Sequence, residues 1–241
     1  MTIGYGIFSG GLDSILSALV LMDQGVETRL LTFATPFFGA DKAMASGRAI
    51  GLEPKVVDLT ELHLKMLQNP KHGYGRYMNP CIDCHALMFK QAGEIMTGEG
   101  GDFLFSGEVL GQRPKSQTRQ ALQIVAKESG FGQVILRPLS ALALPRTRME
   151  ETGLVDRKRL LGFSGRSRKP QMELASRLGI KDYPAPAGGC LLTDPVFSRR
   201  LKELTAHDSP LEARKVKLLN LGRHFRLPGG GKLIVGRNKN E

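Results

Sequence analysis

The first turn of the chain, residues 8–14, places the strongest constraint on its fold. It has the sequence Phe-Ser-Gly-Gly-Leu-Asp-Ser and follows an apolar run, residues 3–8, that predicts a short buried strand. Apolar residues then recur at helical spacing, at Leu12, Ile15, Leu16, Leu19 and Val20. The turn therefore joins a strand to the N-terminus of a helix, where backbone N–H groups have no intrahelical partner. Because these groups and the positive end of the helix dipole attract negative charge, we expect the turn to bind an anion.

The polar positions of this turn have candidate roles in binding a phosphate group. Gly10 and Gly11 let the backbone approach a phosphate closely. Ser9 and Ser14 add hydroxyl donors, and Asp13 is placed to hold a magnesium ion. The alternative is a plain strand-to-helix turn capped by Ser9, since Ser and Asp are ordinary residues at a helix start. The turn is not the P-loop of mononucleotide kinases, because the Gly-Lys-Ser/Thr ending is absent.

The rest of the first 145 residues alternates predicted strands with predicted helices. Further strands are expected at 27–33, 54–59, 103–106 and 134–139, and helices at 40–50, 85–96 and 116–128. This rhythm predicts an α/β fold with a parallel, doubly wound sheet covered on both faces. A ligand then lies off the carboxyl ends of the strands, where Phe33 ends the second strand. The expected buried face of the helix at 85–96 carries Leu87, Met88, Gln91 and Ile95.

Two regions depart from this rhythm. Helical periodicity fails from 60 to 79, and we expect an irregular stretch there with a functional or mobile role. Beyond residue 144 the chain becomes basic, with helices expected at 149–162 and 170–178 and a Pro/Gly-rich loop at 183–190. Helices at 195–206 and 210–220 and two short strands, 222–227 and 232–236, complete the pattern. The predicted domains are a domain with the anion-binding turn at 1–145, a basic helical segment and loop with Cys190 at 146–193, and a small appendage at 194–241.

The charge balance favours a polyanionic partner. Lys and Arg number 34 against 23 Asp and Glu, a formal net charge of +11. The candidate residues for phosphate contacts with such a partner are Arg113, Lys115, Arg146, Arg148, Arg166, Arg168 and Lys169. The alternative is an ordinary solvated basic surface. No apolar run approaches the length of a membrane span, Met1 leads directly into the first strand, and the three cysteines suit a reducing compartment. We therefore expect a cytoplasmic protein without a leader. The oligomeric state, and whether the natural chain is longer, stay open at this point.

The three cysteines leave four interpretations open. Cys81 and Cys84 form a Cys-x-x-Cys pair, and both this pair and Cys190 lie in segments expected to be Gly/Pro-punctuated loops. The cysteines could be inert buried thiols, or they could form a structural zinc site with His85 or His72 as the fourth ligand. They could also form a redox pair, or hold an iron–sulfur cluster in which one iron has no protein ligand. The redox pair is disfavoured, because the flanking residues do not form a thioredoxin-like motif.

The turn at 8–14 resembles, residue for residue, the Ser-Gly-Gly-x-Asp-Ser loop of the PP-loop ATP pyrophosphatases, which adenylate a carbonyl oxygen and release pyrophosphate. The segment Gly107–Gln112, with Ser116-Gln117-Thr118, resembles the Gly-Glu-Ser-Leu-Gly-Gln…Ser-Gln-Thr segment of the tRNA 4-thiouridine synthetases, where it closes over the nucleotide. From the residues alone, a turn with Gly111 at positive φ and Ser116 as helix cap is the alternative. The resemblance implies that ATP contacts Phe8, Ser9, Gly10, Gly11, Asp13, Ser14, Phe33, Gly107, Glu108 and Gln112.

The segment Asn79-Pro80-Cys81-Ile82-Asp83-Cys84 resembles the Asn-Pro-Asp-x-x-Cys motif of the tRNA 2-thiouridylases. In those enzymes the last cysteine, which matches Cys84, transfers sulfur together with a distant cysteine, which Cys190 matches. Cys81 stands where they carry Asp, and the tRNA thiolases that use a 4Fe-4S cluster have such a set of three cysteines. The resemblance implies that Asp13, Cys81, Cys84 and Cys190 are catalytic and that the three cysteines hold a 4Fe-4S cluster, with zinc or a persulfide as alternatives.

The sequence therefore predicts an ATP- and magnesium-dependent tRNA sulfurtransferase with a sulfide or persulfide donor. A uridine carbonyl oxygen is adenylated and then replaced by sulfur at the cysteines, with Arg113 or Lys115 adding electrostatic stabilisation. Two alternatives stay open. One is a PP-loop sulfurtransferase for a small metabolite or cofactor. The other is a non-enzymatic nucleotide- or RNA-binding protein in which the cysteines hold a structural metal.

Overall fold

The computed structural model describes residues 1–185 and 190–238, which form two compact units. Unit 1 comprises Met1–Phe33, Ala40–Val57 and Ile82–Ala187, and unit 2 comprises Ala34–Gly39, Asp58–Cys81 and Gly188–Glu241. Contacts thus assign most of the expected basic segment, 146–193, to the unit that holds the sheet. The expected division into three domains stays a prediction.

Unit 1 is built on a five-stranded sheet of order β3-β2-β1-β4-β5. Its strands are β1 (Ile3–Ile7), β2 (Glu27–Ala34), β3 (Lys55–Asp58), β4 (Phe103–Ser106) and β5 (Ile135–Leu136). β1 pairs in parallel with β2 and with β4, and β4 pairs in parallel with β5. The chain runs outward from β1 to β2 and β3 and then crosses to β4, so the order reverses between β1 and β4. In such sheets the ligand crevice lies at this reversal, beyond the carboxyl ends of the strands.

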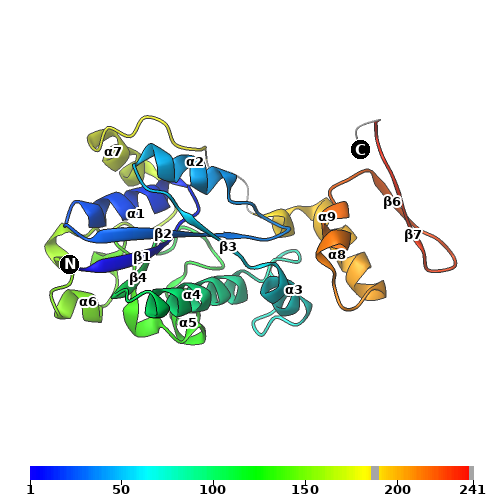
Figure 1. The fold of residues 1–241 in the computed structure, drawn as a ribbon, viewed down its shortest axis with the longest axis horizontal. Helices are drawn as coiled ribbons and strands as arrows, with labels where there is room; N and C mark the ends of the chain where they lie inside the picture. Colours follow the sequence, from blue (N-terminus) through cyan, green and yellow to red (C-terminus); the bar gives the residue numbers. More distant parts are fainter. Residues whose placement is uncertain (186–189, 239–241) are drawn as a thin grey trace. The chain divides into compact units, whose positions relative to one another are not determined.

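Helices cover both faces of the sheet, as the alternation predicts (Figure 1). One face carries α1 (Leu12–Met22), α2 (Asp41–Ala49) and α7 (Lys169–Arg177), and the other carries α4 (Cys81–Gly98) and α5 (Arg119–Ser129). The core between these layers contains large buried side chains, including Phe8, Ile15, Leu21, Phe103 and Phe105. The expected α/β fold class is confirmed. No helix among residues 1–185 and 190–238 is long and apolar enough to cross a membrane.

The helix α4 differs from its prediction in its start and in its buried face. It begins at Cys81, so Cys81 and Cys84 occupy a first helical turn and not a loop. The predicted face of Leu87, Met88, Gln91 and Ile95 is wrong, since the buried face carries Cys84, Ala86, Phe89, Ala92, Gly93 and Met96. The reason is a close approach, because a Cβ on Gly93 would lie 2.3 Å from a ring carbon of Phe131. Close packing requires small residues at this contact, so the face of α4 that carries them is buried in preference to the face with larger apolar residues.

Three other predictions in unit 1 are corrected by local chemistry. α5 begins at Arg119 with Thr118 as its cap, whose hydroxyl accepts from the N–H of Ala121, so Ser116 is not the cap. β5 is two residues long and not the run 134–139, because a 3-10 turn precedes it and the chain turns at Arg137–Ser140. The expected helix at 149–162 is the short α6 (Arg148–Glu151), which stops before Gly153 at a φ of +75°.

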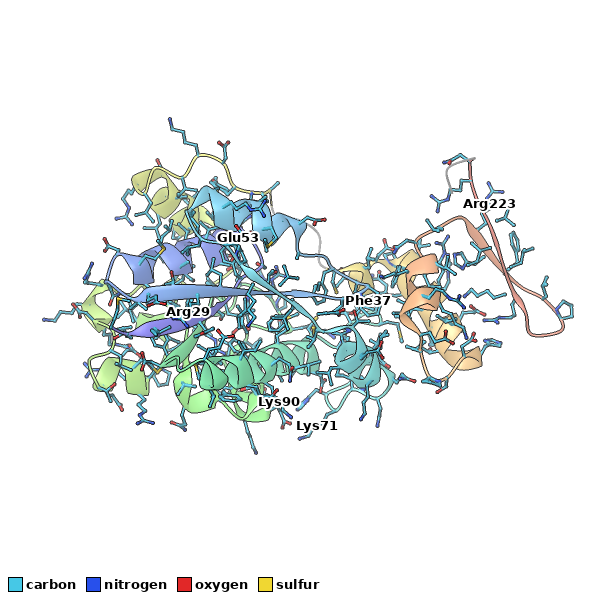
Figure 2. All side chains as sticks on the ribbon, in the orientation of Figure 1. Arg29, Phe37, Glu53, Lys71, Lys90 and Arg223 are labelled. Carbon is cyan, nitrogen blue, oxygen red and sulfur yellow. The ribbon has the colours of Figure 1, made fainter. Side chains whose placement is uncertain are left out.

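Unit 2 joins the C-terminal residues to an insertion from the middle of the chain. Its elements are α3 (Thr60–Gln68), α8 (Pro195–His207), α9 (Ala213–Leu218) and an antiparallel hairpin, β6 (Arg223–Arg226) with β7 (Lys232–Val235). The expectation that 60–79 is irregular is wrong over α3, which buries His63, Leu64 and Leu67. Phe37, labelled in Figure 2, packs in the same core cluster as Leu64 and Leu67.

His63 is fully buried in unit 2 and its two ring nitrogens have no hydrogen-bond partner among the described residues. Its ring lies 5.2 Å from that of Phe37 and 5.9 Å from that of Phe38, centroid to centroid. This apolar surrounding penalises the imidazolium form and lowers the pKa of His63 from 6.5 to about 4. Local spacing does not indicate a special role for this histidine, since its apolar partners come from a segment more than 20 positions away.

We expect the stability of the protein to fall as the pH drops from 6.5 to about 4. The unfolded chain takes up a proton on His63 near pH 6.5 and the folded chain only near pH 4, so the contribution is fully present above 6.5. It amounts to about 3 kcal/mol and is lost across that window. Urea denaturation at stepped pH measures it, and His63→Leu should flatten the curve there. An unchanged curve in the variant would assign the loss to other groups, such as His224, whose pKa burial also lowers.

Candidate functional site

The turn after β1 folds as a close-packed cradle at the N-terminus of α1. Gly10 has a φ of +69°, and a Cβ there would lie 2.6 Å from the carbonyl oxygen of Lys42, at the start of α2. The hydroxyl of Ser46 donates to the Gly10 carbonyl at 2.9 Å, which fixes the turn against α2. Gly11 is the residue that caps α1, and it makes no side-chain capping bond. The first N–H groups of α1 are therefore not satisfied by a side-chain cap, as an anion site requires.

The serine hydroxyls of this turn have different environments. Ser9 is exposed, and its hydroxyl accepts from the N–H of Gly11 at 3.4 Å. Ser14 is buried and donates to the carbonyl of Gly11 at 2.8 Å. Phe8 and Phe33 are buried, and the N–H of Phe8 donates to the carbonyl of Leu31 on β2. Ser9 is thus the hydroxyl open to a ligand, whereas Ser14 braces the turn.

A second loop, Gly107–Gln112, meets this turn from the end of β4. A Cβ on Gly107 would lie 2.5 Å from the backbone nitrogen of Ser14 and 2.6 Å from the carbonyl carbon of Asp13. The side-chain amide of Gln112 donates to Oδ2 of Asp13 at 2.9 Å. Two motifs that are almost 100 residues apart in the chain therefore lie side by side at the point where the strand order reverses.

Asp13 carries the acidic side chain that connects the two loops at this junction. Its other oxygen, Oδ1, is buried and has no hydrogen-bond partner among the described residues. Gln112 in turn accepts a long hydrogen bond of 3.4 Å from the amide of Gln171, a fully buried residue of α7. A buried carboxylate oxygen without a donor is costly, unless a cation or another ligand occupies that side. The donor chemistry of Asp13 therefore fits a magnesium ion.

Glu108 is the centre of a buried ionic cluster rather than an open ligand group. Its carboxylate accepts from Nε of Arg137 at 2.9 Å, lies 2.9 Å from Nδ1 of His85 and accepts from the hydroxyl of Ser106 at 3.2 Å. Burial opposes the ionised form, but Arg137 and the His85 contact outweigh it and lower the pKa of Glu108 from 4.5 to about 2. Glu108 thus fixes His85, next to Cys84, to the loop that faces the turn.

Replacing Glu108 with Gln is expected to destabilise the protein by about 3 kcal/mol, because it leaves the Arg137 charge buried without its counter-ion. In the unaltered protein the contribution of Glu108 is complete above pH 4.5 and is lost as the pH falls towards about 2. Urea denaturation at neutral pH measures the difference. Glu94→Gln, on the exposed side of α4, is the control and should change stability little. An equal effect in both variants would contradict the buried ion pair.

The cysteines occupy well-packed positions. Cys84 is buried on α4, while Cys81, at the start of the same helix, accepts from the side-chain amide of Asn79 at 3.2 Å. Cys190 packs against the core cluster of unit 2, beside the start of the 3-10 helix Leu191–Thr193. Within 1–185 and 190–238, no three His, Cys, Asp or Glu side chains gather as a metal-binding group. Residues 186–189 of the Pro/Gly-rich loop lie outside the described residues.

Asn79 was not among the predicted site residues, although it belongs to the Asn-Pro-Cys motif. Its Oδ1 accepts from the N–H of Tyr77, and its carbonyl accepts from the N–H of Gly75. A Cβ on Gly75 would lie 2.4 Å from the Asn79 amide, so this loop closes tightly on the asparagine. Asn79 therefore contacts the Cys81 sulfur by a direct hydrogen bond and is itself held by the loop around it.

The predicted RNA-contacting residues lie in three groups in unit 1. Arg113 and Lys115 are exposed just after the Gly107–Gln112 loop. Arg166, Arg168 and Lys169 lie just before or at the start of α7, where Nε of Arg168 is buried without a partner among the described residues. Arg146 and Arg148 are exposed at and before α6. Their role in binding RNA stays a proposal.

A parallel sheet whose order reverses beside a Ser-Gly-Gly-x-Asp-Ser turn defines an α/β nucleotide-binding protein of the PP-loop ATP pyrophosphatase class. The family described as "Thiamine biosynthesis protein (ThiI)" matches residues 4–144, which is more than half of the chain. The chain belongs to this family.

Curated relatives match the same part of the chain. A "Probable tRNA sulfurtransferase" from Caldanaerobacter subterraneus is 29% identical over 142 residues, covering 55% of this chain and 35% of the relative. A "tRNA-specific 2-thiouridylase MnmA" from Syntrophomonas wolfei is 32% identical over 110 residues, covering 42% of this chain and 31% of the relative. The matches thus span about a third of the length of these relatives.

Among solved structures, a 4-thiouridine synthetase in complex with RNA and bound ATP aligns with a TM-score of 0.48 and 21% identity. That alignment covers 91% of this chain and 51% of the other.

Proposed function

We propose that this chain is an ATP-dependent tRNA thiolation enzyme that adenylates a uridine carbonyl oxygen and replaces it with sulfur. The observation that carries the proposal is the meeting of the 8–14 turn and the Gly107–Gln112 loop through Gly107 and the Gln112–Asp13 hydrogen bond. The family of the chain and the names of its relatives, tRNA sulfurtransferase and tRNA 2-thiouridylase, support it. The net charge of +11 supports an RNA substrate.

In the proposed first step, the turn at the N-terminus of α1 binds the ATP phosphates through backbone N–H groups and the Ser9 hydroxyl. A magnesium ion held by Oδ1 of Asp13 would neutralise phosphate charge. Gln112 holds the opposite oxygen of Asp13 and so orients that carboxylate. The uridine oxygen attacks the α-phosphorus, the bond to the β-phosphate oxygen breaks, and pyrophosphate leaves with the electron pair. The N–H groups aimed at the phosphates stabilise the charge that develops.

In the proposed second step, sulfur replaces the adenylated oxygen. With hydrosulfide as the donor, a carbon–sulfur bond forms, the carbon–oxygen bond breaks, AMP leaves and the remaining S–H proton passes to solvent. With a persulfide on one cysteine, a second cysteine must then cleave the sulfur–sulfur bond, and the resulting disulfide needs a thiol reductant. Cys84, Cys81 and Cys190 are the proposed sulfur carriers. Because the described side chains form no three-ligand group, we derive no step through a 4Fe-4S cluster.

The central test is pyrophosphate release by the purified chain with ATP and magnesium, with and without unmodified tRNA. We expect release that depends on tRNA and, with a sulfide donor added, thiolated uridine in the digested RNA. Release without RNA but with a small carbonyl substrate would favour a metabolite sulfurtransferase. If neither tRNA nor a small carbonyl substrate led to pyrophosphate release, the proposal of an adenylating enzyme would be wrong.

The form of the sulfur site needs a separate test. Iron and acid-labile sulfide are measured on protein purified without oxygen, beside a Cys81→Ala variant. About four iron atoms per chain, lost in the variant, would support the 4Fe-4S cluster that the resemblance to the thiolases implies. No iron, with activity kept in Cys81→Ala but lost in Cys84→Ala and Cys190→Ala, would instead support a persulfide relay between two cysteines.

A further inference from the structure

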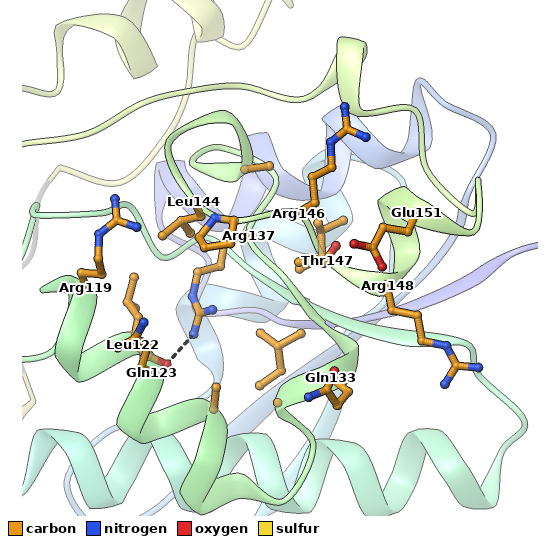
Figure 3. A pocket seen from close by; sticks show the side chains of 16 residues that line it. Arg119, Leu122, Gln123, Gln133, Arg137, Leu144, Arg146, Thr147, Arg148 and Glu151 are labelled. Carbon is orange, nitrogen blue, oxygen red and sulfur yellow. Dashed lines mark hydrogen bonds between the residues drawn. The ribbon is translucent and has the colours of Figure 1, made fainter.

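A cavity of about 340 Å³ lies in unit 1 and shares no lining residue with the 8–14 turn or the Gly107–Gln112 loop. One wall is α5, the floor is the outer edge of β5, and the opposite wall is the segment 141–148 with α6 (Figure 3). β5 is the last strand of the sheet, so its free edge opens into this cavity. Its volume lies in the range of small-molecule sites, about 300–1,000 Å³.

The lining combines an apolar floor with amide groups at the sides. The apolar part of the lining includes Leu122, Ala126, Leu136, Ala141 and Leu144. Gln123 and Gln133 are exposed side chains that line the cavity and carry both donors and acceptors. A flat, weakly polar group with hydrogen-bonding edges suits such a lining, and a nucleobase has this chemistry.

Arginines surround the mouth of the cavity. Arg119, Arg146 and Arg148 are exposed lining residues, and Glu151 is the one acid among the lining residues. Arg137, the fourth lining arginine, is already neutralised by Glu108, whereas no ion pair of Arg146 or Arg148 occurs among the described residues. The mouth therefore carries a net positive charge that attracts phosphate.

The spacing of the guanidinium groups favours a polymer over a free nucleotide. In Figure 3 the guanidinium groups of Arg119, Arg146 and Arg148 lie at separate places around the pocket and do not converge on one point, although those of Arg119 and Arg146 extend the same way. A single phosphate inside the cavity would need groups that converge. Groups that are spaced apart around the pocket instead suit phosphates on both sides of one inserted base, as in a single-stranded or looped RNA segment.

We propose that this cavity receives one unpaired base of the RNA substrate, with Arg119, Arg146 and Arg148 holding the flanking phosphates. The proposal rests on the proposed function, because it takes RNA as the substrate, and it adds a contact separate from the reacting uridine. Arg137 lines the cavity and also donates a hydrogen bond to Glu108, so a single side chain connects the cavity to the Gly107–Gln112 loop.

The test is the affinity for unmodified tRNA, measured by filter binding at several salt concentrations. Arg146→Gln with Arg148→Gln should weaken binding about tenfold and reduce the salt slope by about two, because two phosphate contacts are lost. The charge-matched control is Lys90→Gln with Lys127→Gln, two exposed residues that do not line the cavity. The control should change the affinity less than about twofold, since its lysines are not placed to contact the flanking phosphates.

Charge-neutral variants separate the cavity from general electrostatics. Ala126→Leu fills the cavity, and Gln123→Ala with Gln133→Ala removes its exposed amides without adding bulk. Each should weaken tRNA binding about fivefold with the salt slope unchanged, because base contacts and not phosphate contacts are lost. Thermal melting confirms folding, and the glutamine pair carries the test if Ala126→Leu proves unstable.

Three results would overturn the proposal. The first is that the cavity variants bind tRNA as well as the control pair does. The second is that a fluorescent nucleoside monophosphate binds in an Ala126-dependent manner while tRNA affinity stays unchanged, which would assign the cavity to a free nucleotide. The third is that the unaltered chain binds no tRNA. If either of the first two results were found together with tRNA-dependent pyrophosphate release, the proposed function would stand. Only the proposal that the cavity receives an RNA base would be wrong.

Discussion

Asp13→Asn is expected to lower tRNA-dependent pyrophosphate release by about 100-fold or more while leaving the fold intact. The side-chain oxygen of Asn can still accept the hydrogen bond from Gln112, so the junction of the two loops is kept. The variant instead loses the negative charge at the buried oxygen that has no donor, which is the feature suited to a magnesium ion. Steady-state pyrophosphate release at stepped magnesium concentrations, together with a thermal melt, measures the effect.

The control for Asp13 is Asp23→Asn, at the opposite end of α1. Asp23 is exposed and pairs with Arg159 at the surface, so its loss should leave pyrophosphate release unchanged. Full activity of Asp13→Asn at ordinary magnesium concentrations would show that this carboxylate does not serve the nucleotide. A fall in activity matched by a fall in melting temperature would point to a structural role.

Gly107→Ala is expected to abolish pyrophosphate release and to destabilise the protein by about 1–3 kcal/mol. The added methyl group would meet the backbone of Asp13 and Ser14 at 2.5–2.7 Å, and backbone atoms inside a helix turn cannot rotate away. The loop or the start of α1 must therefore move, which separates the Gln112 amide from Asp13. Pyrophosphate release and urea denaturation measure the two effects.

Gly98→Ala is the matched control for Gly107→Ala. Gly98 ends α4, and a Cβ there meets no atom within 4 Å. We expect this substitution to leave activity unchanged and to raise stability slightly, because Ala restricts the unfolded chain more than Gly does. If Gly107→Ala were as active as Gly98→Ala, the close approach of the two loops would not be needed for the chemistry.

The expected effects at Asp13 and Gly107 share one structural basis. Both residues lie where β1 and β4 end, and each strand delivers one loop to the same edge of the sheet. The Gln112–Asp13 hydrogen bond and the Gly107 approach are independent contacts between these loops. Variants at the two positions should therefore fail for different reasons, one by loss of charge and the other by displacement of backbone.

Local pattern was sufficient to predict the sheet and the turn. The apolar runs of β1, β2 and β4 and the glycine-rich turn are short-range signals, because strand and helix periodicities arise from neighbouring residues. The resemblance of the Gly107–Gln112 loop also implied that this loop lies near the nucleotide, but its direct contact with the turn was not predicted. The binding roles of the predicted residues stay predictions.

The tertiary structure alone decided which partners these residues have. Gln171 reaches Gln112 from a helix beyond the matched region, and Glu108 finds its buried counter-ion in Arg137, 29 positions later. The packing of Phe131 on Gly93 decided the buried face of α4, and burial beside Phe37 lowers the pKa of His63. Such contacts join segments distant in the chain, and their energies depend on packing and desolvation, which local spacing does not encode.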